Sequence, residues 1–281
     1  AYQHLEYFIR EARKIHGVYF VSMQTNGTLL TKEKLEALEK AGLNRIHLSI
    51  HSLDPELSKR LFGNEQYSLE KIAHAIQLIK GTSIELLLTP VWLPKVNDQG
   101  IVELIRFAKE NGIKVAFNPS GHHLKHKREE ILASLKDLAF LVLNEDEAAQ
   151  LVGIPFEKER EVFKKLDELT PGIVAITDGP NGVKVSDGER IYQAGIFKEK
   201  AVVDRTGAGD SFGSGFVARL ALYHMPIGTY TQVAIKEAIR FASANATSVV
   251  EHVGATEGIL TKKEFETDSR WKNFDIKVEK L

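Results

Sequence analysis

The residues best suited to chemistry lie in one glycine-rich stretch, Asp204–Gly215, which reads DRTGAGDSFGSG. A strand pattern leads into it, and a helix is expected to begin at or near Gly207. The first amide groups of a helix have no partner within the helix, and the helix dipole adds positive potential at that end. Gly207, Ala208 and Gly209 carry almost no side chain, so an anion can approach their amides closely. These residues predict an anion-binding site.

Asp210 follows this predicted anion site directly and would repel an anion. A carboxylate is useful there if it takes a proton from an attacking hydroxyl while the amides stabilise the charge that develops on a phosphoryl group. A simpler interpretation is also available. Aspartate is common in a first helical turn as a capping residue, and Gly-x-Gly often forms a tight turn. The stretch by itself leaves both interpretations open.

The composition narrows the classes of function. The chain has 281 residues, enough for one large domain or two ordinary ones, with 43% hydrophobic and 27% charged residues. A net charge of −1, with both signs mixed along the chain, argues against nucleic acid as the main partner. No apolar run approaches the roughly 20 residues of a membrane span, and no signal peptide is visible. The expected location is the cytoplasm, with no membrane partner.

The chain contains no cysteine. Disulfides, thiolate zinc sites and cysteine nucleophiles are therefore excluded. An iron–sulfur cluster held by cysteine is excluded for the same reason.

The elements that must position the glycine-rich stretch alternate between helix and strand patterns. Thr31 and Ser68 are the expected N-caps of two helices, and Gly42 and Gly81 are their expected ends. The predicted elements up to residue 120 are helices 2–15, 31–42, 68–81 and 97–112, and strands 17–25, 45–52, 83–91 and 113–120. Such alternation predicts parallel strands joined by helical crossovers.

Beyond residue 120 the alternation continues and then changes to short strands separated by turn residues. The predicted elements are helix 127–137, strand 138–146, helix 157–169, strand 172–179, short strands 182–188, 189–195 and 201–207, and helices 209–225 and 231–250. The short strands indicate a small antiparallel segment at the edge of a sheet, where an exposed edge invites pairing with a second copy as a homodimer. The expected fold class is α/β, a predominantly parallel sheet of βα units covered by helices on both faces.

Several motifs in the second part of the chain resemble those of the ribokinase-like carbohydrate kinases. VVDRTGAGDSFGSGF resembles the second signature of that family. LVLNEDEAAQL resembles its Asn-x-x-Glu motif, with Asn144 and Glu147, and AITDGPNGV resembles its Thr-x-Gly-x-x-Gly segment, with Thr177, Gly179 and Gly182. ASANATSVVEHVGA resembles the last helix and the loop that closes the nucleotide site, and VAFNPS resembles the strand that ends in Asn-Pro.

The resemblance covers residues 113–265 approximately and implies an ATP-dependent phosphotransferase acting on a sugar or nucleoside hydroxyl. Asp210 would be the general base, and Gly207, Ala208 and Gly209 would form the anion site for the transferred phosphoryl group. Asn144 and Glu147 would help hold Mg²⁺ and the phosphates through waters. Thr177 and Gly179 would lie by the phosphates, with Gly182 in the same cofactor-binding segment. Asn245 would lie near the adenine, and Asp204 and Thr206 would suit a monovalent cation such as K⁺.

The first part of the chain resembles a different family. Residues 22–56 and 89–115 resemble the middle of a radical S-adenosylmethionine enzyme barrel, although the three-cysteine cluster motif is missing. The strand-end residues of this resemblance are Asn26, Gly27, Ser49, His51, Asn97 and Asp98. The kinase family's own first half, which binds the acceptor through a segment with adjacent glycines, has no counterpart here, because the chain has no adjacent glycines.

The chain is therefore interpreted as two joined partial folds: partial-barrel βα units over residues 1–112 and a ribokinase-like nucleotide-binding half over residues 113–281, within one continuous hybrid domain and sheet. A join inside a βα unit indicates recombination, and the hypothesis is an engineered or recombinant chimeric scaffold that folds and binds nucleotide without turnover. A divergent kinase is the alternative origin. A third hypothesis is a remnant that binds S-adenosylmethionine.

Overall fold

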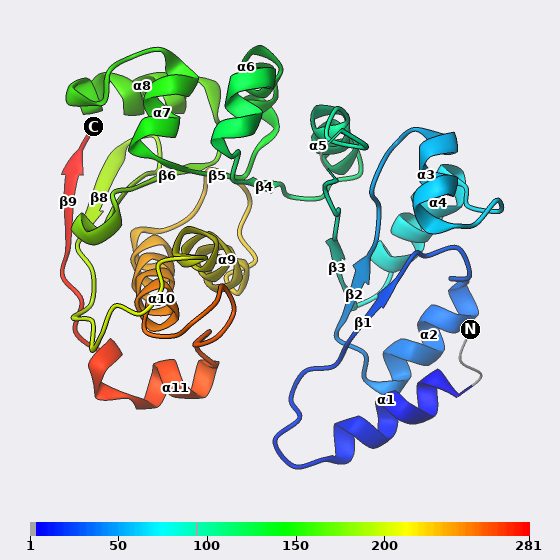
Figure 1. Cartoon of the computed structure of the whole chain (residues 1–281). Coiled ribbons are helices and arrows are strands. Elements are labelled where there is room, and N and C mark those ends of the chain that lie inside the picture. The colour runs from blue at the N-terminus through cyan, green and yellow to red at the C-terminus, as the bar shows by residue number, and fades with distance from the viewer. Residues whose placement is uncertain (1–3, 94) are drawn as a thin grey trace. The chain divides into compact units, whose positions relative to one another are not determined.

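The computed structural model describes residues 4–93 and 95–281, and the chain divides into two compact units, 1–113 and 114–281 (Figure 1). The described strands form two sheets, one of three strands and one of six. The expected single continuous sheet is therefore not what the structure has. Of the predicted strand 113–120, only two residues take ladder positions, and both pair with the following strand in the second unit. The resemblance of the first part to a radical S-adenosylmethionine barrel stays a prediction.

The first unit is built on three parallel strands in the order β1-β2-β3. Its strands are β1(Ser22–Thr25), β2(Arg45–Leu48) and β3(Glu85–Leu88), and its helices are α1(Leu5–Lys14), α2(Lys32–Ala41), α3(Pro55–Phe62), α4(Leu69–Lys80) and α5(Ile101–Glu110). The strands alternate with α2, with α3 and α4, and with α5, so the predicted βα pattern is confirmed. Helix α3 was not predicted. The predicted helix 2–15 begins in residues outside those described.

The predicted caps of the first unit are confirmed. The hydroxyls of Thr31 and Ser68 each accept the backbone N–H of the residue three positions later, and Gly42 ends α2 in the left-handed conformation at φ 98°. On β2, Ile46 and Leu48 are fully buried in the core of this unit. Polar and apolar positions alternate along the strand, as one packed face requires.

Asn97 holds the loop that follows β3. It is 3% exposed, and its Nδ2 donates to the carbonyl oxygens of His51 and Val91, both at 2.7 Å, while its Oδ1 accepts the N–H of Leu93 at 2.6 Å. His51 Nδ1 accepts the N–H of Val91 at 3.1 Å, and the His51 ring stacks on Phe62. The strand-end residues Asn97 and His51 thus have structural partners within the unit.

The second unit carries the six-stranded sheet, in the order β4-β5-β6-β7-β8-β9. The strands are β4(Ala116–Phe117), β5(Phe140–Asn144), β6(Ile173–Thr177), β7(Val183–Ser186), β8(Arg190–Ala194) and β9(Ile276–Lys280). The first three are parallel and the rest antiparallel, which confirms the predicted antiparallel segment.

Two strands of the second unit differ from the sequence analysis. Segment 201–207, a predicted strand, forms none, although the Val203 N–H donates to the Val250 carbonyl at 2.9 Å. Strand β9 was not predicted, and it pairs with β8 over its whole length. The chain's own last strand therefore covers the edge that was expected to be open for a second copy. The homodimer stays a prediction.

Helices cover both faces of the six-stranded sheet, as predicted: α6, α7 and α8 lie on one side and α9 and α10 on the other (Figure 1). They are α6(Gly121–Ser134), α7(Glu145–Val152), α8(Glu159–Leu169), α9(Ala208–Ala221), α10(Gln232–Val250) and α11(Lys262–Thr267), with short 3₁₀ turns at Leu135–Asp137, Phe156–Lys158, Gly179–Asn181 and Ser269–Trp271. The α/β fold class is confirmed.

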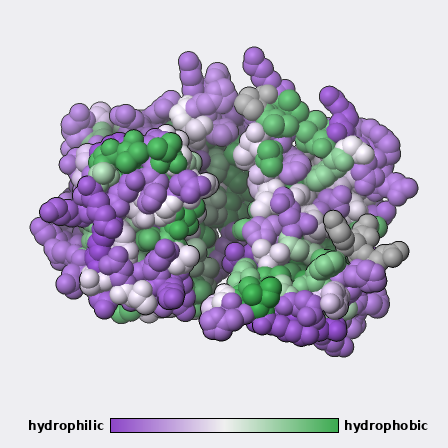
Figure 2. Space-filling model, turned by 60° about the horizontal axis from the view of Figure 1, so that its bottom comes forward, coloured by the Kyte–Doolittle hydropathy of each residue, from purple (hydrophilic) through white to green (hydrophobic). Residues whose placement is uncertain are grey.

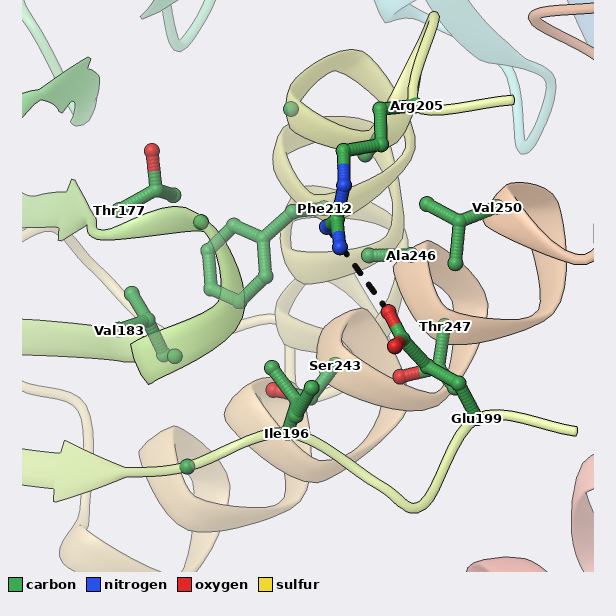
Figure 3. A pocket seen from close by; sticks show the side chains of 15 residues that line it. Thr177, Val183, Ile196, Glu199, Arg205, Phe212, Ser243, Ala246, Thr247 and Val250 are labelled. Carbon is green, nitrogen blue, oxygen red and sulfur yellow. Dashed lines mark ion pairs between the residues drawn. The ribbon is translucent and has the colours of Figure 1, made fainter. Parts of the chain in front are cut away.

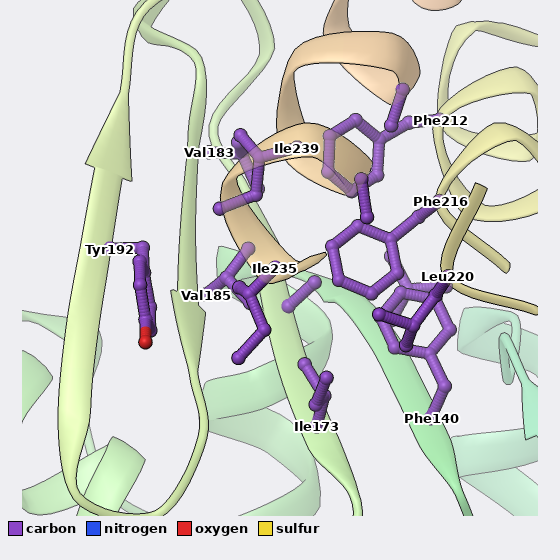
Figure 4. Packing of buried hydrophobic residues seen from close by; sticks show 14 of the residues in the cluster. Phe140, Ile173, Val183, Val185, Tyr192, Phe212, Phe216, Leu220, Ile235 and Ile239 are labelled. Atoms are coloured by element: carbon purple, nitrogen blue, oxygen red, sulfur yellow. The ribbon is translucent and has the colours of Figure 1, made fainter. Parts of the chain in front are cut away.

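Helix α9 packs closely against the sheet and against α10 (Figure 4). The Phe216 ring stacks on Phe140 of β5 at a centroid distance of 4.6 Å. A Cβ at Gly213 would lie 3.3 Å from Val142, and one at Gly215 would lie 3.3 Å from the Cα of Ala242. These two glycines of the glycine-rich stretch therefore serve close packing.

On the face shown in Figure 2 the surface is mostly hydrophilic, and hydrophobic side chains gather in separate patches. A single exposed apolar residue such as Val253 is ordinary in globular proteins. Within residues 4–93 and 95–281, no helix combines the length and apolar character needed to cross a bilayer.

Asp167 of α8 is a partly buried carboxylate beside β7. Its Oδ2 accepts a hydrogen bond from the Ser186 hydroxyl at 2.6 Å, while its Oδ1 is buried with no partner in the described structure. Burial raises the pKa of Asp167 to about 6, and the charge of Asp187 acts in the same direction, against the hydrogen bond from Ser186. The ionised form is thus disfavoured in the folded state.

We expect Asp167→Asn to stabilise the fold at neutral pH. Because the folded-state pKa lies above the usual value of 3.8, ionisation costs folding energy that is absent below about pH 4 and complete above about pH 6. The gain at pH 7.5 should reach about 1–3 kcal/mol and vanish at pH 4. Urea unfolding at both pH values measures it, with the exposed neighbour Glu168→Gln as control. A gain independent of pH would contradict this account.

Candidate functional site

Gly207 sets the start of α9. It is the N-cap residue, in the left-handed conformation at φ 80°, and a Cβ there would lie 2.7 Å from both the Cα and the Cβ of Ala255. Only glycine fits both the backbone angle and the space. The helix begins at Ala208, which agrees with the start predicted from the sequence, and Asp210 lies exposed in the first turn.

The free amides at this helix start are those of Gly209 and Asp210. The Ala208 N–H already donates to the Arg205 carbonyl at 3.3 Å, and the first bond of the helix runs from the Ser211 N–H at 2.8 Å. The amides between them belong to the turn that has no acceptor within the helix. Of the expected Gly207–Gly209 set, only Ala208 donates its N–H within the described structure, and Asp210 adds a further free amide. The role of this set as an anion site stays a prediction.

Asp204 ties the turn before α9 to the loop after α10. Its Oδ1 accepts the Thr206 N–H at 2.9 Å, and its Oδ2 accepts the Gly254 N–H at 3.1 Å. The hydrogen bonds from Thr206, and then that from Gly254, hold the pKa of Asp204 below its usual value. Both carboxylate oxygens are thus engaged by the protein itself.

Asn144 and Glu147 form a reciprocal capping box at the start of α7. The Asn144 N–H donates to Glu147 Oε2 at 2.9 Å, and the Glu147 N–H donates to Asn144 Oδ1 at 2.8 Å. Asn144 ends β5 and stands in register with Thr177 at the end of β6. The carboxyl ends of these parallel strands therefore bring the Asn-x-x-Glu and Thr-x-Gly-x-x-Gly motifs together.

The turn between β6 and β7 contains two glycines whose surroundings differ. A Cβ at Gly182, which has φ 105°, would overlap the Ala194 carbonyl oxygen. Gly179, at φ 45°, faces open space. The first is required by packing, whereas the second leaves room beside Thr177.

A pocket of about 210 Å³ lies between this turn, the segment after β8, the start of α9 and the last turns of α10 (Figure 3). Its lining residues are Thr177, Gly179, Gly182, Val183, Gly195, Ile196, Glu199, Arg205, Ala208, Gly209, Phe212, Ser243, Ala246, Thr247 and Val250. The structure thus brings five of the predicted residues to one cavity, namely Thr177, Gly179, Gly182, Ala208 and Gly209.

Several lining residues were missed by the sequence analysis. Ser243 and Thr247 are four residues apart and therefore share one face of α10, a spacing that is visible in the sequence. Glu199 and Arg205 form an ion pair across the pocket, with 3.9 Å between a guanidinium nitrogen and a carboxylate oxygen (Figure 3). Phe212 forms an apolar wall from α9.

Asn245 does not line this pocket. It is 2% exposed, its Nδ2 donates to the Ser211 carbonyl at 3.0 Å, and its Oδ1 accepts the Leu260 N–H at 2.9 Å. Both of these hydrogen bonds join it to backbone groups, one in α9 and one in the loop after α10. Asn245 is thus placed to hold the first turn of α9. Ser243 and Thr247 of the same helix line the cavity instead.

Comparison with known proteins assigns the chain to a family. The family model described as pfkB family carbohydrate kinase matches residues 8–262. The chain belongs to the pfkB family of carbohydrate kinases. The match begins far before residue 113, so the expectation that the kinase resemblance is confined to the second part is corrected.

Two curated relatives and one solved structure describe the similarity further. Ribokinase of Haemophilus influenzae is 34% identical over 59% of this chain and 50% of its own length, and GTP 3',8-cyclase of Aquifex aeolicus is 35% identical over 40% of this chain and 35% of its own length. The chain spans half or less of these relatives. The structure of ribokinase from Giardia lamblia aligns with a TM-score of 0.56 and 18% identity, covering 93% of this chain and 85% of that one, which shows a common fold.

We expect Gly207→Ala to destabilise the second unit by about 2–4 kcal/mol, because it combines backbone strain with a steric overlap against Ala255. The matched control is Gly188→Ala, where φ is 88° but no atom lies within 4 Å of the added Cβ. That variant should lose only about 1 kcal/mol. Chemical unfolding compares them, and equal losses would show that the contact with Ala255 does not matter.

Proposed function

We propose that this chain is an ATP-dependent phosphotransferase that acts on a sugar or nucleoside hydroxyl. The observation that carries the proposal is the opening of the pocket onto the first turn of α9, where the amides of Gly209 and Asp210 lack helical acceptors. Helix starts of this kind bind phosphate groups. Membership of the pfkB family supports the same reaction class.

The pocket suits the base and sugar of a nucleotide. Ile196, Phe212 and Val250 supply apolar walls for a flat ring, and the hydroxyls of Ser243 and Thr247 supply hydrogen-bonding groups. Thr177 lies toward the ends of β5 and β6, where the phosphate chain would pass. Asn245 would then support the site from behind rather than touch adenine.

Mg²⁺ would be held by oxygen atoms at the capping box of Asn144 and Glu147, largely through waters. Among the described residues no three His, Cys, Asp or Glu side chains are grouped as a metal site. Mg²⁺ fits such a place because it keeps several waters and binds one or two carboxylates together with substrate phosphates. When bound, it neutralises phosphate charge. A monovalent cation such as K⁺ beside Asp204 and Thr206 stays a prediction.

Asp210 would act as the general base. Its carboxylate lies exposed at the helix start, one residue after Gly209, so it can take the proton of an acceptor hydroxyl as that oxygen attacks the terminal phosphorus. The amides of the first turn would stabilise the negative charge on the transferred group. The acceptor itself would be a sugar or a nucleoside.

A chimeric scaffold without turnover is the second candidate. It is supported by two separate sheets and by a relative over two-fifths of the chain that is named for a cyclisation rather than for phosphoryl transfer. In this case the nucleotide site is present, but no part of the chain presents an acceptor to Asp210.

Calorimetric titration with ATP and Mg²⁺, followed by a screen of sugars and nucleosides for ADP release, tests both candidates. A kinase should bind ATP, and Asp210→Asn should bind it within about threefold while losing about 10²-fold or more in turnover. The control Asp275→Asn removes an exposed carboxylate outside the pocket and should leave both unchanged.

The possible results separate the candidates. ATP binding without ADP release for any acceptor would favour the scaffold. Turnover that survives in Asp210→Asn would contradict the role of that residue. An intact fold that takes up no ATP would overturn the proposed function, and heat from S-adenosylmethionine instead would favour the third hypothesis.

A further inference from the structure

Two charged residues, Glu199 and Arg205, face each other across the pocket (Figure 3). The other lining residues are apolar, glycine or hydroxyl-bearing. The two charges therefore neutralise each other inside a cavity that opens onto a helix start. Neither charge is needed to hold the walls together, because the backbone on each side is fixed by other bonds.

On the Arg205 side, the backbone is held by the hydrogen bonds from the Thr206 N–H to Asp204 Oδ1 and from the Ala208 N–H to the Arg205 carbonyl. On the Glu199 side, the Lys200 N–H donates to the Glu251 carboxylate at 2.6 Å. The two side chains thus extend from fixed backbone into the pocket. The Arg205 side chain is 54% exposed, whereas that of Glu199 is 19% exposed.

The ion pair itself is weak. Its closest approach of 3.9 Å is at the outer limit of a salt bridge, and half-exposed pairs of this kind contribute little to stability. A phosphate group at the free amides of α9 would compete well for Arg205, because guanidinium binds phosphate through two parallel hydrogen bonds. The same phosphate would be repelled by the Glu199 carboxylate.

We propose that Arg205 is a phosphate-binding residue of this pocket which Glu199 holds in the absence of ligand, so that Glu199 lowers the affinity for nucleotides that carry phosphates. The inference rests on the proposed nucleotide site and adds a discrimination between charged and uncharged ligands. Adenosine has no phosphate to exchange for Glu199. ADP and ATP do, and gain Arg205 when they bind.

The test is calorimetric titration of the full chain and its variants with ATP·Mg²⁺, ADP and adenosine at low salt. Glu199→Gln should bind ATP and ADP about two- to fivefold more tightly, because Arg205 is released. Arg205→Gln should bind both about tenfold or more weakly, and Arg205→Lys should fall between it and the unchanged chain. Adenosine affinity should stay within about twofold throughout.

A double variant tests how Glu199 acts. If Glu199 acts by holding Arg205, adding Glu199→Gln to Arg205→Gln should change ATP affinity by less than about twofold. A full gain in that background would mean direct repulsion of the ligand, and would overturn the holding role. The cation control is Lys198→Gln, one residue before Glu199 and outside the pocket lining, which should bind ATP as the unchanged chain does.

The outcomes separate this inference from the proposed function. If the unchanged chain binds no ATP while thermal unfolding shows an intact fold, the proposed function and the inference both fail. If the unchanged chain binds ATP and the Glu199 and Arg205 variants bind it equally well, the inference fails and the nucleotide site stands. Changes in affinity that are equally large for adenosine would also overturn the inference, because adenosine carries no phosphate.

Discussion

The contact between the start of α9 and the loop after α10 is the constraint on which the candidate site depends. Gly207 lies so close to Ala255 that no side chain fits between them, and Asp204 bonds the Gly254 amide of the same loop. Asn245 adds a buried bond to the first turn of α9. Because three separate interactions hold this turn, its free amides have a fixed direction before any ligand arrives, which is the condition for electrostatic stabilisation.

The direction of α9 is set in turn by the core. Gly213 and Gly215 let the helix approach β5 and α10, and Phe216 stacks on Phe140 beneath them. The pocket is therefore the space left between a closely packed helix pair and a sheet whose strands end beside it. The Glu199–Arg205 pair at this pocket is partly exposed and contributes little to stability.

The two units differ in how completely other elements cover their sheets. In the second unit, helices cover both faces and β9 covers the edge of β8. In the first unit, β2 buries Ile46 and Leu48 among helices, while Arg45 and His47 point to the opposite, partly exposed face. Parallel sheets are usually covered on both faces. The sheet of the first unit is therefore buried mainly on one face.

The sequence by itself determined the α/β class, the caps at Thr31 and Ser68, and the helix start at Gly207, because each depends on local backbone preferences and periodicity. It left β9 unrecognised and gave segment 201–207 as a strand. Only the tertiary structure decided that Asn245 is turned inward to bond backbone groups and that Arg205 faces Glu199 across a cavity. Both outcomes depend on contacts between segments that are far apart in the chain. Strand pairing and the direction of a side chain at such contacts are set by packing between those segments.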